Sequence, residues 1–272
     1  MNYKEIVKEV LLTEAKELEI ASSSISFDIE NIVNLIIKSK GKLIVTGVGK
    51  SGLVGAKIAA TLASTGTSSF FLHPTEAMHG DLGMIGKEDI VLAISYSGES
   101  EELIQILPHI KRFNIPLIAM AKDENSTLAK YSDYFININV QKEACPLDTA
   151  PTSSTTLTMA MGDALAVCLM KKRDFKKEDF ASFHPGGSLG KKLFVKLDDL
   201  LRKENLPIVS RETKLKDAII VMSQGRLGSV IIEDENKKVI GVLSDGDLRR
   251  ALMKDGFSID CNVESIATLN PR

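Results

Sequence analysis

The chain has 272 residues, which predicts about two domains at roughly 150 residues per domain. Hydrophobic residues make up 44% and charged residues 26%, which argues against disorder as the main state, and 5% aromatic residues without Trp disfavour a surface that stacks nucleic-acid bases. The 34 basic and 36 acidic residues leave a formal charge of −2, so the chain as a whole offers no basic field to DNA or RNA.

The N-terminal sequence and the cysteines predict a cytosolic protein. Acidic residues stand among the first nine positions, where a signal peptide would carry a basic segment followed by an apolar one. We find no apolar run that approaches the roughly 18 residues of a membrane span. Cys145, Cys168 and Cys261 lack the paired spacing of a disulfide framework or a zinc site. We therefore expect a cytoplasmic location, no membrane association and no nucleic-acid partner.

Alternating helices and strands predict a parallel sheet in the first two thirds of the chain. Two amphipathic helices come first, over residues 3–20 and 28–39, and the apolar stripe of the first could cover its own domain or a second subunit. The expected strands cover residues 42–46, 69–72, 90–95, 117–120 and 134–138, and the expected later helices cover 52–64, 100–113, 124–131 and 153–171. Near-continuous apolar strands fit a sheet buried on both faces, so we expect an α/β fold with a doubly wound parallel sheet over residues 1–180.

The composition then changes, and a smaller unit follows. Residues 181–206 are expected to form a charged linker. Residues 207–260 predict a small α/β module of order β-α-β-β-α, with helices near 215–224 and from 247 and strands at 229–233 and 239–243. Residues 261–272 echo residues 197–207, so we expect them to open a second copy of this module that the chain does not complete.

The first candidate binding loop, Gly47 to Gly52, follows an expected strand and precedes a helix whose free N–H groups favour an anion. It fits the pattern G-x-G-x-x-G, but the next strand is not followed by the acidic residue that would hold a ribose. Ile44 stands where a Walker A loop requires glycine. The loop therefore disfavours a dinucleotide cofactor and nucleoside triphosphate hydrolysis, and Lys50 and Ser51 suit a compact phosphate ester, with a plain tight turn as the alternative.

Two further loops bring hydroxyl groups to helix starts. Residues 95–100 and 151–156 each follow a strand or loop and precede a helix, and both are rich in Ser or Thr. One hydroxyl would serve as an ordinary helix cap, but five in a row exceed that need. The three loops together predict a site for a phosphorylated, polyhydroxy ligand.

Seven motifs together closely resemble the D-arabinose 5-phosphate isomerase family, in which a sugar-isomerase (SIS) domain precedes a pair of cystathionine β-synthase type (CBS) domains. The motifs are Gly47-x-Gly49-Lys50-Ser51-Gly52, Ser95-x-Ser97-Gly98-Glu99, His79-Gly80-Asp81-Leu82-Gly83, Glu143-Ala144-Cys145-Pro146-Leu147, Ala150-Pro151-Thr152-Ser153-Ser154-Thr155-Thr156, Gly162-Asp163-Ala164-Leu165-Ala166 and His184-Pro185-Gly186-Gly187. The segment 241–247 matches the CBS pattern. The resemblance covers nearly the whole chain, but the second CBS repeat is missing beyond its first residues.

The resemblance implies an aldose-ketose isomerase that interconverts D-arabinose 5-phosphate and D-ribulose 5-phosphate through an enediol. This step feeds synthesis of the eight-carbon acid Kdo for lipopolysaccharide or capsule and requires no cofactor. The competing interpretation is a non-catalytic phosphosugar-binding regulator with a SIS domain, which would not need Glu143 and His184. An amidotransferase-type sugar enzyme is disfavoured because no N-terminal cysteine nucleophile is present.

The positions that match the family's catalytic residues are Lys50, Glu102, Glu143 and His184. We expect Glu143 to be the base; an ordinary carboxylate pKa of about 4.3 is low for this task, so partial desolvation is expected. Lys50 would meet phosphate or the enediolate, and His184 would open the ring or shuttle a proton in a neighbouring subunit's site. Glu102 alternatively complements the dipole of its helix.

The remaining implied contacts involve substrate, metal and nucleotide. The expected substrate-binding residues are Gly49, Ser51, Gly66, Thr67, His73, His79, Ser95, Ser97, Glu99, Ser100, Thr152, Ser153 and Ser154. His73 and His79 flank Glu76, and the resemblance suggests an inhibitory zinc there. Thr213 and Asp247 are the positions that would contact an adenine nucleotide in a CBS pair. The resemblance also implies a homotetramer.

Overall fold

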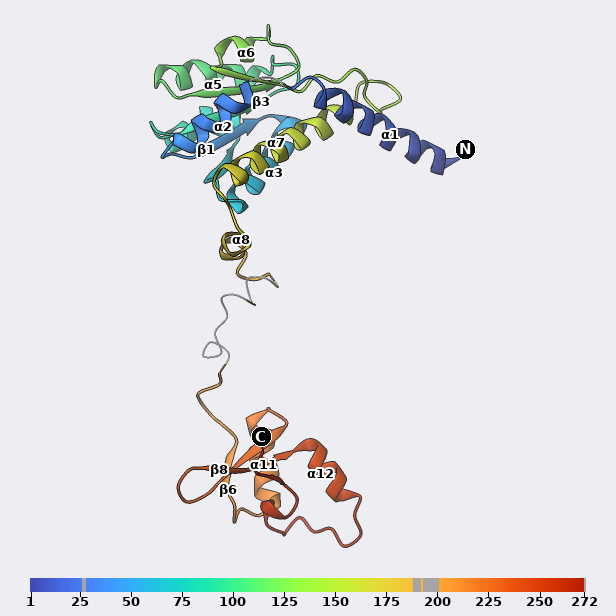
Figure 1. Ribbon diagram of the computed structural model, residues 1–272, viewed down its shortest axis with the longest axis vertical. Coiled ribbons are helices and arrows are strands. Elements are labelled where there is room, and N and C mark those ends of the chain that lie inside the picture. The colour runs from blue at the N-terminus through green and yellow to red at the C-terminus, as the bar shows by residue number, and fades with distance from the viewer. Residues whose placement is uncertain (26–27, 188–191, 193–200, 272) are drawn as a thin grey trace. The chain divides into compact units, whose positions relative to one another are not determined.

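The computed structural model describes residues 1–25, 28–187, 192 and 201–271, and the chain divides into a first unit, residues 1–194, and a second unit, residues 195–272 (Figure 1). Each unit contains its own sheet, which confirms the predicted α/β class with a second, smaller module. The division between the units falls inside the segment predicted as a linker.

The first unit is built on a five-stranded parallel sheet. Its strands are β1 (Leu43–Gly47), β2 (Ser69–Leu72), β3 (Ile90–Ile94), β4 (Leu117–Ala121) and β5 (Tyr134–Asn137), in the order β2-β1-β3-β4-β5. Every residue of β1, β3 and β4 is buried, as their continuous apolar runs predict. The chain order reverses between β1 and β3, and this switch point is where ligands bind in doubly wound sheets.

Helices cover both faces of this sheet. One core is formed with α1 (Tyr3–Ser22), α2 (Asp28–Lys38), α3 (Gly49–Ser64) and α7 (Ser153–Lys172). The other is formed with α4 (Pro74–Met78), α5 (Glu101–Arg112) and α6 (Thr127–Tyr131), and the 3-10 segment η1 (Asp81–Met84) follows α4. The loops after β1 and β3 therefore lead to helices on opposite faces of the sheet.

Helix α7 is central to the first core. In the part of the chain that the structure describes, it is the one helix long and apolar enough to cross a membrane by length and composition. Leu157, Leu165 and Leu169 are buried, and α7 packs against α1, α2 and α3. Gly162 permits close packing with α3, because a Cβ there would overlap the side chain of Ile58. The apolar composition of α7 thus matches a core helix.

The apolar stripe of α1 is only partly covered. Leu18 and Ala21, near its C-terminal end, pack against the first core, whereas Ile6, Val7 and Leu11 are 43–62% exposed. Figure 1 shows the N-terminal part of α1 extending from the rest of the first unit. The first unit therefore covers the C-terminal half of the apolar stripe of α1 and leaves the N-terminal half exposed.

Several helix positions differ from the sequence prediction, and two of them concern candidate site residues. Helix α3 begins at Gly49 instead of near residue 52, so Lys50 and Ser51 lie in its first turn and not in a loop. Gly49 has a φ of +58°, which glycine adopts readily, and this allows the chain to turn directly from strand to helix. Helix α8 (Lys177–Phe183) was not predicted in the charged segment after α7; it ends immediately before His184.

The second unit has a four-stranded sheet of order β6-β7-β8-β9. Its elements are β6 (Ile208–Ser210), α11 (Leu215–Gly225), β7 (Ser229–Glu233), β8 (Val239–Ser244), α12 (Asp245–Leu252), η2 (Val263–Ser265) and β9 (Thr268–Leu269). Strand β9 pairs antiparallel with β8, and Val263 is fully buried in the same core. Residues 261–271 thus extend the sheet of the first module, with Val263 in its apolar core, and the expectation that they open a second copy stays a prediction.

Candidate active site

The Glu143 carboxylate lies at the N-terminus of α7. Its Oε2 atom accepts hydrogen bonds from the Thr152 N–H and the Thr152 hydroxyl, both at 2.7 Å, and from the Ser154 N–H at 3.3 Å. Helix N-termini present unpaired N–H groups and favour negative charge. The row of hydroxyl residues predicted from the sequence therefore holds a carboxylate of the same chain.

The pKa of Glu143 results from opposing influences. Burial raises the pKa, but hydrogen bonds from the side chains and backbone N–H groups of Ser154 and Thr152 together outweigh burial, and the pKa lies below its ordinary value. The expected desolvation is present, yet it does not give the raised pKa that a stronger base would have. Glu143 is therefore ionised at neutral pH.

The loop between β5 and α7 folds Glu143 back onto the helix. Asp148 Oδ1 accepts a hydrogen bond from the Glu143 N–H at 2.8 Å, and the Thr152 hydroxyl accepts one from the Ala144 N–H at 2.8 Å. Two carboxylates of α1 support the same region: Glu17 accepts from the Gln141 N–H at 2.8 Å, and Glu14 accepts from a hydroxyl on α7. The position of Glu143 thus depends on contacts from three segments.

A small pocket of about 30 Å³ lies where the first turns of α3 and α7 converge. Its lining residues are Lys50, Ser51, Val54, Tyr96, Pro151, Ser154, Thr155 and Thr158. The buried Ser153 hydroxyl at the start of α7 has no hydrogen-bond partner among the described residues. The pocket therefore brings together three of the predicted site residues, Lys50, Ser51 and Ser154, at the carboxyl edge of the sheet.

The loop after β3 is held by its own hydroxyl groups. Ser95 Oγ lies 2.8 Å from Ser100 Oγ and accepts from the Gly98 N–H at 3.1 Å, and Ser97 Oγ accepts from the Glu99 N–H at 3.2 Å. Gly98 has a φ of +72°, and a Cβ there would overlap Ser126. These serines follow β3 at the switch point, next to the end of β1.

The two candidate glutamates of this region behave differently from Glu143. Glu99 Oε1 accepts a hydrogen bond from the Thr127 N–H at 2.7 Å, which, with the Thr127 side chain, lowers the pKa of Glu99. Glu99 therefore has a local partner at the start of α6, and its predicted substrate contact stays a prediction. Glu102 is exposed in the first turn of α5, where it suits the helix dipole.

His73 and His79 stand at the two ends of the short helix α4. His73 caps its N-terminus, with Nδ1 accepting from the Thr75 N–H at 3.3 Å, and His79 is its C-terminal cap. In the described parts of the chain, no group of three or more His, Cys, Asp or Glu side chains is placed to hold a metal ion. Among the described residues of one chain, His73 and His79 therefore have no third ligand beside them, and the inhibitory zinc stays a prediction.

Three predicted residues lie at the other end of α7. Thr67 accepts a hydrogen bond from Arg173, just after α7, and Gly66 lies against the Phe175 ring, which stacks on Phe183 beside His184. With 20 residues, α7 is about 30 Å long. The structure therefore does not bring Gly66, Thr67 and His184 together with Glu143 within one chain.

The two predicted nucleotide contacts in the second unit have local partners. Asp247 accepts hydrogen bonds from the Ser244 N–H at 3.0 Å and hydroxyl at 2.6 Å, forming a capping box at the start of α12. Thr213 Oγ1 lies 3.1 Å from Ser210 Oγ. Both side chains are explained by local structure, and nucleotide binding stays a prediction.

Tyr96 and Glu17 also lie in this region, and no role was predicted for either from the amino-acid order. Tyr96 lies in the serine-rich loop of residues 95–100, and an aromatic residue among hydroxyl residues is the sequence feature that could have indicated a role for it. In α1, the sequence feature that could have indicated polar contacts from this helix was Glu14, a carboxylate on an otherwise apolar stripe. Burial raises the pKa of Tyr96, so its phenol is neutral at neutral pH.

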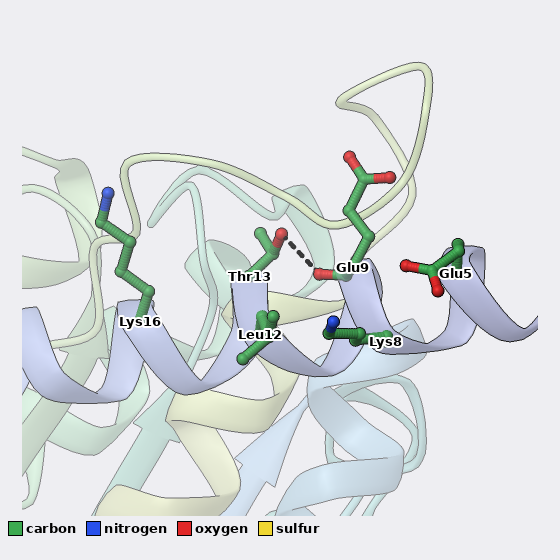
Figure 2. Close-up of a pocket in the computed structure, with 6 residues that line it drawn as sticks. All are labelled: Glu5, Lys8, Glu9, Leu12, Thr13 and Lys16. Atoms are coloured by element: carbon green, nitrogen blue, oxygen red, sulfur yellow. Dashed lines mark hydrogen bonds between the residues drawn. The ribbon is translucent and has the colours of Figure 1, made fainter.

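A second hollow lies along the exposed part of α1 (Figure 2). Its lining residues are Glu5, Lys8, Glu9, Leu12, Thr13 and Lys16. They all come from one helix, and the hydrogen bond drawn there, from the Thr13 hydroxyl to the Glu9 carbonyl at 2.9 Å, is internal to it. Of these two hollows, only the pocket between α3 and α7 is lined by polar groups from several elements. We therefore place the candidate active site at that pocket.

Comparisons with known proteins show the family to which the chain belongs. The SIS domain model matches residues 35–168, and the CBS domain model matches residues 197–254. An uncharacterised protein of Helicobacter pylori is 54% identical over 272 residues, covering 98% of this chain and 82% of that protein. Arabinose 5-phosphate isomerase KdsD of Yersinia pestis is 46% identical over 273 residues, covering 100% and 82%. The structure of E. coli CFT073 c3406 in complex with arabinose 5-phosphate has a TM-score of 0.66 at 40% identity, covering 68% of this chain and 100% of that one.

The switch-point pocket, the doubly wound sheet and the two domain matches define a SIS-domain sugar-phosphate protein with a CBS module. At 46% identity over four fifths of the length of such a relative, the chain belongs to the arabinose 5-phosphate isomerase family.

Proposed function

We propose that this chain is an aldose-ketose isomerase that interconverts D-arabinose 5-phosphate and D-ribulose 5-phosphate. The observation that carries the proposal is the ionised Glu143 carboxylate held at the start of α7, where Ser154 also lines the pocket that contains Lys50. The names of the Yersinia relative and of the E. coli structure support arabinose 5-phosphate as the substrate. The similar Helicobacter protein has no activity in its name.

The chemistry follows from the groups at the pocket. Glu143 removes the proton next to the carbonyl and returns it to the neighbouring carbon, so that one base serves both steps of an enediol reaction. Because the hydrogen bonds lower its pKa, it is a weak base, and the developing enediolate needs stabilisation from nearby positive groups. Lys50 and the N-terminal turns of α3 and α7 supply that field.

The phosphate group is assigned to the serines after β3. Ser95, Ser97 and Ser100 carry hydroxyl groups at the carboxyl edge of the sheet, beside the start of α3. Hydroxyl and N–H groups at strand ends of this kind are suited to a phosphate ester. The sugar would then extend from these serines toward Glu143.

The site is proposed to be completed by a second copy of the chain. His184, with Gly66 and Thr67, lies beyond the far end of α7 from Glu143, so His184 is assigned to the site of a neighbouring subunit. His184 is ordered by stacking on Phe180, with ring centroids 4.0 Å apart, and its Nδ1 lies 2.9 Å from the Phe180 carbonyl. A homotetramer in the cytoplasm, supplying Kdo synthesis for lipopolysaccharide or capsule, completes the proposal.

Ligands beyond the substrate belong to the same proposal. We propose that the isomerisation needs no redox cofactor, because the oxidation of one substrate carbon is balanced by the reduction of its neighbour. Zinc is proposed to inhibit through His73 and His79, which requires ligands beyond these two. An adenine nucleotide is proposed to act on the CBS module near Thr213 and Asp247.

The test is incubation of the protein with arabinose 5-phosphate in D2O, with ribulose 5-phosphate formation and deuterium uptake followed by NMR. Glucose 6-phosphate and ribose 5-phosphate are the controls. Conversion and exchange limited to arabinose 5-phosphate support the proposal and an enediol route. Binding without exchange would refute it and favour the phosphosugar-binding regulator.

A further inference from the structure

Tyr96 spans the carboxyl edge of the sheet next to the pocket. It follows β3, and its Oη atom accepts a hydrogen bond of 3.4 Å from the Val140 N–H, beyond β5. Lys122, directly after β4, places its Nζ atom 5.5 Å from the centroid of the Tyr96 ring. The side chain therefore crosses the end of β4, which lies between β3 and β5 in the sheet.

The ring of Tyr96 is held firmly in this position. It packs against the first core, and its carbonyl accepts a hydrogen bond from the Lys122 N–H at 2.9 Å. It lines the pocket together with Lys50 of α3 and Ser154 of α7. Contacts at the backbone, ring and hydroxyl leave this side chain little freedom, so it forms a fixed wall of the pocket.

The wall is also neutral. Burial raises the pKa of the Tyr96 phenol, and the negative charges of Glu143, Glu17 and Asp148 also raise it. A neutral ring does not repel a phosphorylated sugar, so its effect on a ligand comes from its shape.

We infer that Tyr96 determines the size of the sugar, restricting the pocket to pentose 5-phosphates and excluding hexose 6-phosphates. This inference rests on the proposed function, which places the phosphate at the serines around Tyr96 and the carbonyl end near Glu143. With both ends of the ligand held, one additional carbon must bulge sideways, and the fixed Tyr96 ring that lines the pocket limits the space for it. One methylene group more or less typically changes discrimination in an apolar pocket by about 10- to 200-fold, which sets the scale for one additional sugar carbon.

The test uses two ligands that have no carbonyl group and therefore do not react, arabinitol 5-phosphate and glucitol 6-phosphate. Their binding to the full chain is measured by titration calorimetry. The wild type is expected to prefer the pentitol phosphate, and Tyr96→Ala is expected to lower this preference at least tenfold, mainly by tighter binding of the hexitol phosphate. Tyr96→Phe keeps the ring and is expected to keep the preference, as is the matched control Tyr131→Ala on α6.

A wild type without preference, or a folded Tyr96→Ala variant with the wild-type ratio, would overturn the inference. If Tyr96→Ala does not fold by circular dichroism, Tyr96→Leu decides, because leucine retains apolar packing but is shorter than the phenol ring. The ratio is a binding measurement, so it is obtained whether or not the wild type converts arabinose 5-phosphate. Failure of the proposed function is seen separately, as absence of turnover in the NMR assay.

Discussion

Replacing Glu143 by glutamine separates the charge of this side chain from its shape. Glutamine keeps an oxygen acceptor for the N–H groups of Thr152 and Ser154 but loses the negative charge at the start of α7. A charge at a helix N-terminus contributes about 0.3–1 kcal/mol, whereas loss of the whole cap in Glu143→Ala costs about 1–2 kcal/mol. Loss of a general base costs about 100-fold or more in turnover, so both variants are expected to be inactive while still binding the sugar phosphate.

The stability effect has a defined dependence on pH. Because the pKa of Glu143 is lower in the folded protein than in the unfolded chain, ionised Glu143 stabilises the fold at pH values above the unfolded pKa. This contribution is lost as the pH falls through the folded pKa. The difference in stability between wild type and Glu143→Gln is therefore expected at neutral pH and should disappear in acid.

Thermal unfolding at pH 7 and in acid measures this difference, at about 2–4 °C in Tm per kcal/mol for a domain of this size. Glu124→Gln, at an exposed position outside the helices, is the matched control and should leave Tm and turnover unchanged. Wild-type turnover in Glu143→Gln would refute its role as the base. An equal loss of Tm at both pH values would refute the argument that its charge stabilises α7.

Three further changes test the packing and the caps. Gly162→Ala raises the helix propensity of α7 by about 1 kcal/mol, but the new methyl group overlaps buried Ile58, which costs about 1–3 kcal/mol. Urea unfolding should therefore show net destabilisation. An unchanged or higher unfolding midpoint would contradict this packing. Asp247→Ala removes a capping carboxylate whose pKa is lowered mainly by Ser244, and the loss is expected to be about 1 kcal/mol. At pH values above the unfolded pKa this loss should appear as roughly fivefold faster hydrogen exchange in α12, and the difference should vanish as the pH falls through the folded pKa. Equal exchange in both proteins at neutral pH would show that the capping box contributes nothing to stability. Glu17→Ala leaves the Gln141 N–H without its partner and should lower stability by about 1 kcal/mol in urea unfolding, whereas Glu17→Gln keeps an acceptor and should lose less; equal losses would assign the effect to the charge alone.

Most of the first unit could be predicted because its elements have strong local signals. The five strands were placed within one or two residues, since continuous apolar runs bounded by polar turns are typical of buried strands. The short helices α4 and α8 were missed, because five to seven residues carry too little periodicity to distinguish a helix from a loop. Strand β9 was missed because two exposed residues form a strand only by pairing with β8.

The candidate site could be predicted as three loops but not as a set of contacts. The amino-acid order determined that polar loops follow β1 and β3 and that hydroxyl residues begin α7, because strand ends and helix starts have recognisable local chemistry. Only the tertiary structure decided that Glu143 caps α7, that Tyr96 reaches Val140 and that Glu17 reaches Gln141. It also separated His184 from Glu143 by the length of α7. These outcomes depend on how distant segments pack around a shared core, and such packing leaves no signal in the spacing of neighbouring residues.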